Sequence, residues 1–468
     1  MNVDLTFQEE HLKQIRSLVL REDGVEGAAY VLYGESNISR DPWTRERRKR
    51  LTSHTVLAIP DEDLISADNT HITWSTASFV RLLKRAADEG LVVGIVHTHP
   101  NGPASFSSQD DENEAELARF ARNRNGKTAS LISVLLAGPT EILARIWSDV
   151  GAPIPIPSVR SLGRSFKFLA GHMTGIANQA LARQALAFGS DINDQLQTMR
   201  IGVVGGGGTG SATATLLARL GVGSLVLFDE DIVEVTNLNR LHGARSADAD
   251  AMRPKVDVLA RVISEMGIGA RVVPIQKWIG DEGCQDALKS CDLIFGCTDD
   301  NDGRLLLNRL AYFYLIPVID MGLAIEPFED GRRLRDLSGR VTVLLPGAPC
   351  LLCRGIVDPT LAREESLKRI RPEEYSRQKR EAYVHGADNP APAVVTFTTG
   401  IACIAVDEML QGLTGFRGDG GWTWQRVRRF DLMQDRRPGA SPVVDCPICS
   451  DRLYWGRGDL DLFLDRVG

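Results

Sequence analysis

Two histidines and one aspartate in the first third of the chain have the spacing of a metal site. His97 and His99 stand two residues apart at the end of the apolar stretch LVVGIVHTH, so both side chains leave the same face of a strand. Asp110 can supply a third ligand, which leaves the fourth position of a tetrahedral zinc ion to water. Water bound in this way becomes a hydroxide nucleophile near neutral pH. The pattern predicts a zinc hydrolase in which Ser107 can hydrogen-bond the developing oxyanion.

The same residues have plainer interpretations. His-x-His pairs are common in cores and on surfaces, and Ser107-x-x-Asp110 before a helical run is a capping box that serves only the helix. The complete spacing after a buried strand favours the metal site over either alternative. A hydrolase of this kind also needs a carboxylate that takes a proton from the water and passes it to the leaving amine.

A glycine-rich stretch begins at Gly205, after the apolar run IGVV, and opens a helix. This order favours phosphate binding, because backbone N–H groups can approach the phosphates and the helix N-terminus attracts anions. Asp229 ends the next strand, where a carboxylate can hold ribose hydroxyls. These features alone fit an NAD-dependent dehydrogenase equally well. The glycines expected at the phosphates are Gly205, Gly207, Gly208 and Gly210.

Polar residues further along the chain decide in favour of ATP. Asn237, Arg240 and Lys255 suit a triphosphate whose negative charge grows at the leaving pyrophosphate. Asp299 follows a later strand, where a carboxylate can hold Mg²⁺. Each residue alone could be a helix cap or a surface group, but their joint order predicts an adenylating enzyme.

The composition sets the broad class of the protein. The chain has 468 residues, of which 43% are hydrophobic and 25% charged, an ordinary balance for a globular protein of two or three domains. Its net charge of −7 argues against a nucleic-acid surface. The N-terminal MNVDLTFQEEHLKQ lacks the apolar core of a signal peptide, and no stretch is apolar enough to span a membrane. We therefore expect a cytoplasmic protein without nucleic-acid or membrane partners.

Four of the eight cysteines form two C-x-x-C pairs. The pairs are Cys350 with Cys353 and Cys446 with Cys449. Four thiolates in this arrangement bind a structural zinc ion and leave no open position for catalysis. Disulfides are disfavoured in a cytosolic chain.

The expected secondary-structure elements fall into two blocks. Residues 1–150 mix helices and strands, while residues 161–468 alternate apolar strands with helices, which predicts a doubly wound α/β sheet. Between them, residues 151–160 carry three prolines within five positions and are expected to form a stiff extended linker. The segment 354–385, dense in Arg, Lys and Glu, is expected to be a solvated crossover.

The first block resembles the JAMM metalloproteases, also called MPN or JAB proteins, whose pattern is H-x-H-x7-S-x2-D with an upstream glutamate. The resemblance implies that the two histidines and the aspartate bind zinc and that Ser107 assists the oxyanion. It also implies a catalytic glutamate at the start of an early strand. Glu26, ahead of GAAYVLYG, fits this position best, and Glu22 is the alternative.

The second block resembles the E1-like activating enzymes of the ThiF/MoeB superfamily. Their D-x-D-x-V-x-x-[ST]-N-L-x-R motif ends here at Arg240, and Lys255 and Asp299 follow in the family order, with Asp300 in place of the usual asparagine. The resemblance implies that ATP and Mg²⁺ bind here and that the four cysteines hold zinc. It also implies that Arg183 reaches the ATP of a partner subunit, so a homodimer is expected.

Together the two resemblances predict a bifunctional enzyme. One domain would hydrolyse peptide or isopeptide bonds after the C-terminal glycine of a ubiquitin-like protein, and the other would adenylate that glycine. The alternatives are activation of a sulfur carrier for thiocarboxylate formation and a non-catalytic scaffold that binds a ubiquitin-like protein. Conjugation would add an E2-like partner.

The cysteines bear on whether a thioester forms. E1 enzymes that form one carry a cysteine in the crossover segment, but residues 354–402 contain none. Cys403 lies inside an apolar helix and is expected to be buried in the core. Adenylation without a thioester is therefore the expected reaction.

Overall fold

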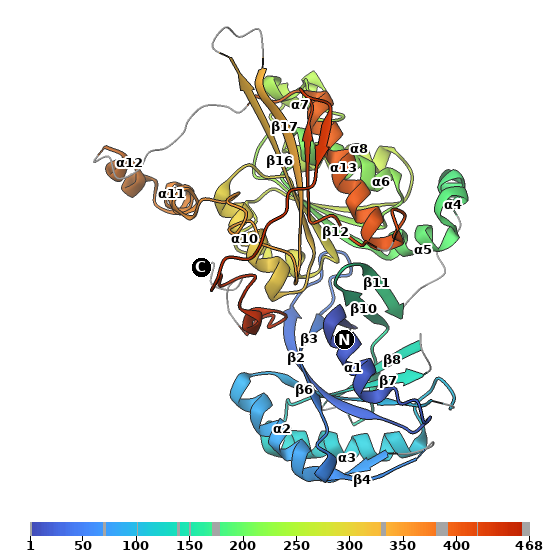
Figure 1. Cartoon of the computed structure of the whole chain (residues 1–468). Helices are drawn as coiled ribbons and strands as arrows, with labels where there is room; N and C mark the ends of the chain where they lie inside the picture. The colour runs from blue at the N-terminus through green and yellow to red at the C-terminus, as the bar shows by residue number, and fades with distance from the viewer. Residues whose placement is uncertain are drawn as a thin grey trace.

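The chain folds into two α/β bodies, each built around one large mixed sheet (Figure 1). In Figure 1 the N-terminal body, blue to teal, lies below the C-terminal body, green to red. The mixed α/β class predicted from the sequence is confirmed. The computed structural model describes residues 2–68, 72–100, 102–137, 141–148, 151–170, 178–328, 334–380, 392–418 and 420–460.

The first sheet has nine strands in the order β11-β10-β1-β3-β2-β6-β7-β8-β9. A separate two-stranded hairpin, β4 (Leu64–Ala67) with β5 (Ile72–Trp74), lies beyond it. The nine strands are β1 (Asn2–Gln8), β2 (Ala28–Ile38), β3 (Arg48–Ala58), β6 (Val92–Thr98), β7 (Leu131–Ala137), β8 (Glu141–Trp147), β9 (Ile154–Pro155), β10 (Ser158–Leu162) and β11 (Phe166–Ala170).

Helices cover both faces of this sheet, and strand alternation assigns the side chains to them. Along β2, Tyr30 and Leu32 pack in the core under α2 (Thr76–Glu89) and α3 (Ser108–Asn125). Their neighbours Ala29 and Val31 pack on the opposite face, in the core that includes α1 (Glu9–Val19). Because successive residues of a strand point to opposite faces, one run of apolar residues serves two cores.

The proline-rich stretch 151–160 is not the linker expected from its composition. Ile154–Pro155 pairs with β8 at the edge of the sheet, and Ser158–Leu162 runs parallel to β1. A proline cannot donate a ladder hydrogen bond, but an edge position or the residue before a strand tolerates it. The first sheet therefore continues as far as Ala170, beyond the block boundary expected from the pattern.

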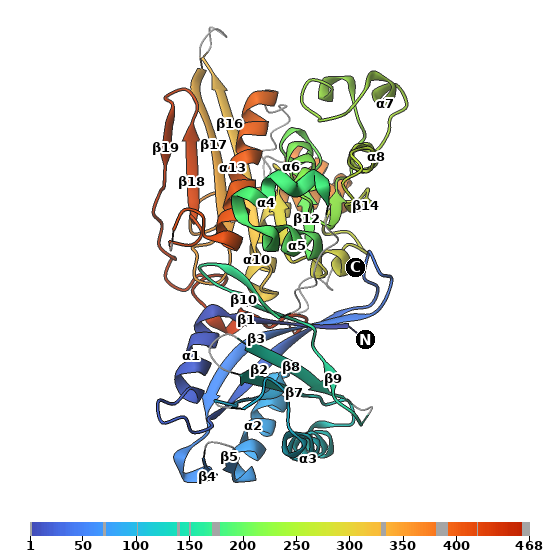
Figure 2. The same cartoon turned by 90° about the vertical axis from the view of Figure 1, so that its right-hand side faces the viewer.

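The second sheet has eight strands in the order β14-β13-β12-β15-β16-β17-β18-β19. The first five of these run parallel, and the last three extend the sheet in antiparallel fashion at one edge (Figure 2). The strands are β12 (Arg200–Val204), β13 (Ser224–Phe228), β14 (Arg271–Ile275), β15 (Leu293–Gly296), β16 (Val318–Pro327), β17 (Leu334–Leu344), β18 (Gln425–Arg429) and β19 (Gln434–Arg436).

The strand order reverses between β12 and β15, which makes that point the topological switch of a doubly wound sheet. Ligands of such sheets bind beyond the carboxyl ends of the strands at the switch. The helices packed on the two faces are α6 (Gly208–Arg219), α8 (Lys255–Glu265) and α13 (Val395–Thr414) on one side and α9 (Gln285–Lys289) and α10 (Asn301–Phe313) on the other.

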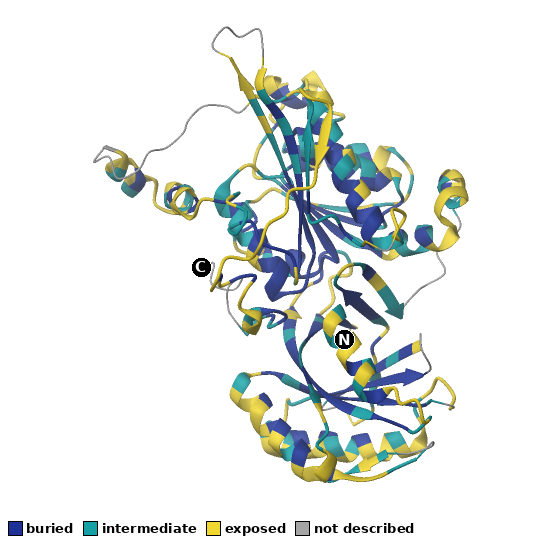
Figure 3. Cartoon of the chain, in the orientation of Figure 1, coloured by how far each residue is buried: buried dark blue, intermediate teal, exposed yellow. Residues whose placement is uncertain are grey.

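The expected solvated crossover contains two helices that extend from the second body (Figure 1). They are α11 (Pro359–Ile370) and α12 (Pro372–Arg380), and their surfaces are largely exposed (Figure 3). Within the ranges described above, no helix has the length and apolarity needed to cross a bilayer. The remaining short helices are α4 (Ala182–Phe188), α5 (Ser190–Thr198) and α7 (Ser246–Asp250).

The end of the chain crosses back onto the first body. We call residues 452–460 the C-terminal strap. The Gly456 N–H donates to Tyr312 O in α10 at 2.9 Å, and Gly456 O accepts from the Thr52 hydroxyl of β3 at 2.6 Å. The Asp459 N–H donates to Glu35 O in β2 at 2.9 Å. The strap therefore hydrogen-bonds to both bodies at once.

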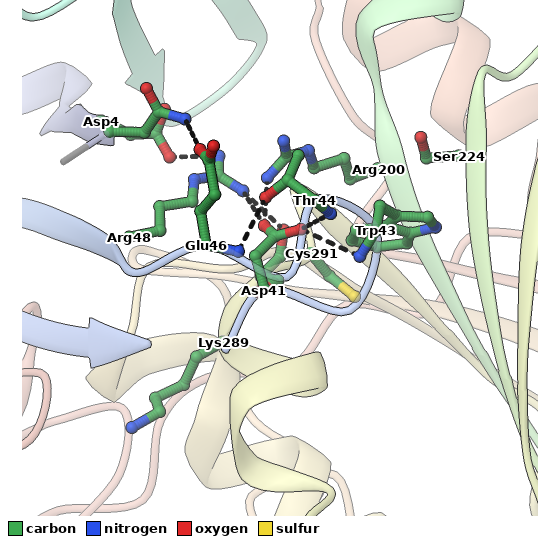
Figure 4. A network of polar contacts seen from close by, with 12 residues as sticks. Asp4, Asp41, Trp43, Thr44, Glu46, Arg48, Arg200, Ser224, Lys289 and Cys291 are labelled. Carbon is green, nitrogen blue, oxygen red and sulfur yellow. Dashed lines mark hydrogen bonds and ion pairs between the residues drawn. The ribbon is translucent and has the colours of Figure 1, made fainter. Parts of the chain in front are cut away.

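A buried network of charges lies where the bodies meet (Figure 4). Asp41 of the first body accepts from Arg200 of the second at 2.6 Å and from its own neighbour Arg48 at 3.4 Å. Arg48 also contacts Asp4, and Trp43 donates its indole N–H to Leu225 O at 3.3 Å. Asp41 is 0% exposed, and its other carboxylate oxygen accepts the backbone N–H groups of Trp43 and Thr44, each at 3.0 Å.

A second set of contacts continues the network across the same interface. Arg160 of β10 pairs with Asp292 at 2.8 Å, and Arg50 of β3 donates to Lys289 O at 2.9 Å and also to Cys291 O. Charges removed from water are stabilised only by well-placed partners, and here each of the two arginines has an acceptor in the second body.

Removing the acid at the centre of the network tests its contribution. Asp41→Ala should lower the free energy of unfolding by about 3–5 kcal/mol, because it removes the carboxylate that pairs with the half-buried Arg200 and leaves the buried Arg48 with Asp4 as its remaining ion-pair partner. Denaturant unfolding followed by fluorescence measures this change. Glu46→Ala, in the same loop but exposed, is the matched control and should stay within about 0.5 kcal/mol of the wild type. Equal losses in the two variants would contradict the assignment.

Candidate metal site, nucleotide site and cysteine cluster

The metal site lies at the carboxyl end of β6, a strand flanked by β2 and β7. His97 Nε2 is 3.2 Å from Asp110 Oδ1, and His99 Nε2 is 3.4 Å from Asp110 Oδ2. One ligand atom from each residue lies within 4.8 Å of the others. The structure therefore brings together the three residues that the sequence spacing predicts.

Asp110 is held in place by the N-terminus of α3. Ser107 is the N-cap, and its hydroxyl oxygen accepts the Asp110 N–H at 3.1 Å. Asp110 Oδ2 in turn accepts the Ser107 N–H at 2.7 Å and the Ser107 hydroxyl at 2.8 Å. Burial by itself would raise the pKa of Asp110, but the neighbouring His97 imidazole and the hydrogen bonds from Ser107 hold it well below its usual range. The capping box and the ligand position thus coexist.

The donor set fits a zinc ion. A tetrahedral ion with bonds of about 2.0–2.1 Å separates its nitrogen and oxygen ligands by roughly 3.3–3.4 Å, close to the two distances above. Among the described residues, His97 Nε2 is buried without a hydrogen-bond partner. A buried acceptor left unpaired costs free energy that a metal ion would offset.

Glu26 lies beside the histidines and Glu22 does not. Glu26 is 5% exposed, its Oε1 lies 3.9 Å from His99 Nε2, and its N–H donates to Asp68 O at 2.8 Å. Burial raises the pKa of Glu26, as suits a carboxylate that must accept and release a proton. Glu22 is exposed in the turn before it.

Behind the site lies a buried group of residues that the sequence did not indicate. Glu114, one turn after Asp110 in α3, accepts from Arg145 Nε at 2.7 Å, from Trp147 Nε1 at 2.7 Å and from Ser133 Oγ at 2.5 Å. These contacts fix α3, and with it Asp110, against β7 and β8. The three donors lie on strands distant in sequence, so no local pattern announces them.

The nucleotide site is a cavity of about 580 Å³ at the topological switch of the second sheet. Gly205, Gly207 and Gly208 line it, as predicted. Gly205 has φ of 90°, and a Cβ there would lie 2.8 Å from Cys297 O. Gly210 is not among the described lining residues and serves the packing instead, since its Cβ would lie 1.7 Å from Gly205 O. Backbone can therefore approach a phosphate closely.

The predicted ribose and phosphate residues line the same cavity. Asp229 accepts the Gly206 N–H at 2.5 Å, and Lys255 lies 3.8 Å from Asp229 and 2.6 Å from Asp231. Burial raises the pKa of Asp229, despite the nearby lysine. Arg240 donates to Thr236 O at 2.6 Å. The remaining predicted residues of this group, Asn237 and Asp299, also line the cavity.

The loop after β15 carries the acids expected to hold magnesium. Asp299 is exposed to the cavity, whereas Asp300 is the N-cap of α10 and accepts the Gly303 N–H at 2.5 Å. A capping role explains the departure from the family pattern, because aspartate and asparagine are equally good N-caps. Arg304 of α10 also lines the cavity and donates to Met321 O at 3.2 Å.

The sequence missed several residues of the cavity wall. Lys277 and Trp278 follow β14, Glu230 follows β13, Thr398 belongs to α13, and Arg369 comes from α11 in the expected solvated crossover. Arg369 is the least predictable of these, because nothing in a charged, weakly patterned helix distinguishes an arginine that turns back to the sheet.

Arg183 is exposed on α4, and among the described residues it is not part of the cavity wall. It thus remains a proposal that this arginine serves the site of another subunit.

The four cysteines form one cluster, with ligand atoms within 4.8 Å of one another. Cys350 and Cys446 sulfurs are 3.7 Å apart, and those of Cys353 and Cys449 are 3.4 Å apart. A tetrahedral zinc ion with bonds of about 2.3 Å separates its sulfurs by roughly 3.8 Å, so the donor set fits.

The expected burial of Cys403 is wrong. Cys403 is exposed on α13, because it lies on the face of the helix turned away from the sheet. Cys297 is half-buried in the wall of the nucleotide cavity, and burial raises its pKa far above the usual range of a thiol. Neither position combines exposure with a lowered pKa, the two properties of a reactive thiolate.

Two family models match the chain, one in each body. Residues 181–446, more than half of the chain, match the ThiF family. The chain belongs to the ThiF family. Residues 8–148 match the prokaryotic homologs of the JAB domain, so this ThiF protein is a fusion of the two families. The resemblances stated from the motifs are confirmed.

Curated relatives of this ThiF protein match about a third of its chain. The SAMP-activating enzyme E1 of Haloferax volcanii is 30% identical over 35% of this chain and 56% of its own length. A molybdopterin-synthase adenylyltransferase of Salmonella typhimurium is 32% identical over 36% of this chain and 65% of its own length. Ubiquitin-like modifier-activating enzyme 5 of Culex quinquefasciatus is 28% identical over 36% of this chain and 45% of its own length. The chain thus spans about half to two thirds of these relatives.

Among solved structures, E. coli MccB with succinimide is similar to this ThiF protein with a TM-score of 0.45 and 16% identity. The similarity covers 58% of this chain and 75% of that one.

Substitution of the buried glutamate separates metal binding from proton transfer. Glu26→Gln should retain zinc at the histidine site but lower the rate of peptide hydrolysis by about 10²–10⁴-fold, because the amide cannot accept the proton of the water. Metal analysis and cleavage of a ubiquitin-like fusion measure the two effects. Glu22→Gln is the matched control and should cleave normally. Normal cleavage by Glu26→Gln would refute the assignment.

Loss of one cysteine tests the cluster. Cys350→Ser should remove one zinc equivalent per chain and lower the melting temperature, because metal binding at such a site is coupled to folding. Atomic emission spectrometry measures the zinc content, and scanning calorimetry measures the melting temperature. Cys403→Ser, which removes an exposed thiol, should change neither. Unchanged zinc content in Cys350→Ser would rule out a metal at the cluster.

Proposed function

We propose that this chain processes and activates the C-terminal tail of a ubiquitin-like or sulfur-carrier protein. The first body would hydrolyse the peptide or isopeptide bond after the C-terminal glycine, and the second would adenylate the glycine carboxylate with ATP. The observation that carries the proposal is the presence in one chain of an open three-ligand metal site beside a buried carboxylate and a cation-lined nucleotide cavity. The relatives described above, which are activating enzymes and adenylyltransferases by name, support the second half.

In the hydrolytic half, His97, His99 and Asp110 would hold Zn²⁺, which when bound acidifies a water molecule. The Glu26 carboxylate would take a proton from this water and deliver it to the leaving amine. Ser107 already donates its hydroxyl proton to Asp110, so its support of an oxyanion would require a change of partner. Its first contribution is therefore to hold the ligand.

In the adenylating half, the glycine carboxylate of the substrate would attack the α-phosphorus of ATP. A bond from the carboxylate oxygen to phosphorus forms as the bond to pyrophosphate breaks. Arg240 and Lys255 would neutralise the growing charge, and the glycine loop would hold the phosphates through backbone N–H groups. Asp299 would hold Mg²⁺, which shields the triphosphate. Arg183 of a second copy would complete the site in a homodimer.

Sulfur-carrier activation is the second candidate, and the absence of cysteine from residues 354–402 favours it. Activation for conjugation usually continues to a thioester, whereas activation of a sulfur carrier ends at the adenylate. A dithiothreitol-sensitive adduct with the substrate would favour conjugation, and its absence would favour sulfur transfer. Loss of such an adduct in Cys403→Ala would locate the nucleophile.

Two variants separate the two activities. His97→Ala should abolish cleavage of a fusion after Gly-Gly but retain ATP–pyrophosphate exchange, because it removes only a metal ligand of the first body. Lys255→Ala should retain cleavage and lower exchange by about 10²–10³-fold, because it removes a cation that opposes the triphosphate. Assays run in parallel against candidate proteins that end in Gly-Gly give both readouts. A wild-type chain that cleaves but never exchanges, or the reverse, would refute bifunctionality.

A further inference from the structure

The crossover helix α11 turns one arginine back into the nucleotide cavity. Arg369 lies near the end of α11, and its guanidinium carbon is 3.6 Å from the centroid of the Trp278 ring. Both residues line the cavity. A guanidinium at this distance over an indole face makes a cation–π stack.

The stack is fixed from several sides. Arg369 Nη1 pairs with Asp302 Oδ2 at 2.7 Å, and Trp278 Nε1 donates to Asp300 Oδ2 at 3.4 Å. One turn earlier on α11, Glu365 accepts the Asp302 N–H at 2.9 Å. The Arg369 guanidinium is therefore held by the first turn of α10, which directly follows the loop that carries the proposed magnesium ligand.

The order of elements along the sheet edge shows which part of a nucleotide would meet this stack. The glycine loop follows β12, Asp229 follows the neighbouring β13, and Trp278 follows β14 beyond it. A nucleotide with its phosphates at the glycines and its ribose at Asp229 extends its base toward β14. A Cβ at Gly280 would lie 1.8 Å from the Trp278 ring, so the indole is packed by the chain itself on that side.

We propose that Arg369 is the platform for the base of the bound nucleotide, stacked between Trp278 and a purine. The planar guanidinium covers the indole on one face and offers its other face to the cavity, where a base can stack on it. Arg369 thereby makes α11 part of the nucleotide site. This inference rests on the proposed adenylating function.

Direct binding measurements test the role without turnover. Isothermal titration of the full chain with the non-hydrolysable ATP analogue AMPCPP and with adenosine gives two dissociation constants. Arg369→Ala should raise both by about 5- to 100-fold, which is the range of stacking contributions to a base. Arg369→Lys keeps the positive charge but loses the planar guanidinium. It should weaken the binding of both ligands nearly as much as Arg369→Ala does.

Arg363→Ala is the matched control, because Arg363 is an exposed arginine of the same helix that is not among the described lining residues of the cavity. It should bind both ligands like the wild type. Weaker AMPCPP binding by Arg369→Ala with unchanged adenosine binding would overturn the inference, since Arg369 would then contact phosphate. Unchanged binding of both ligands would overturn it as well. A wild-type chain that binds neither ligand would instead refute the proposed function.

Discussion

The ion pairs between Asp41 and the arginines at the body interface determine how the rest of the molecule is arranged. Arg48 belongs to β3 of the first sheet and Arg200 to β12 of the second sheet. The Asp41 carboxylate therefore links the two bodies. A movement of one body relative to the other would separate these buried ion pairs, which is costly because water cannot replace the lost partners. The network therefore joins the first strand of the second sheet, β12, to β3 of the first sheet.

Each site repeats the same construction on its own sheet. A buried strand ends, a polar loop follows, and the N-terminus of a helix supplies the decisive group: Asp110 in α3 and the glycines that open α6. In both cases contacts with the sheet fix the position of the helix. In the first body Glu114 of α3 accepts a hydrogen bond from Arg145, and in the second body the apolar face of α6 packs in the core. The chemistry is thus placed by helices whose positions are set by packing.

Local patterns predicted most of this arrangement. The strands before His97 and Gly205 are continuous apolar runs, and the residues after them have fixed spacings, so neighbouring residues sufficed to locate the candidate metal ligands, Lys255 and three of the four glycines, Gly210 being the exception. The failures share one cause. The strands within 151–160, the exposure of Cys403 and the inward turn of Arg369 all depend on partners far away in sequence. Proline content and charge density describe a segment but not what it packs against.

The C-terminal strap has a consequence for how the protein is made. Leu460 packs against the core beneath α2, and Asp459 hydrogen-bonds to β2, so the first body is completed by residues that follow the entire second body. During synthesis the nascent first sheet leaves the ribosome long before its final neighbours exist. Its last contacts must wait for translation to reach residue 460, and until then the hydrogen-bonding groups of β2 and β3 and the apolar side chains beside Leu460 lack these partners. The first body is therefore not a contiguous stretch of the chain, and the order of translation differs from the order in which its contacts can form.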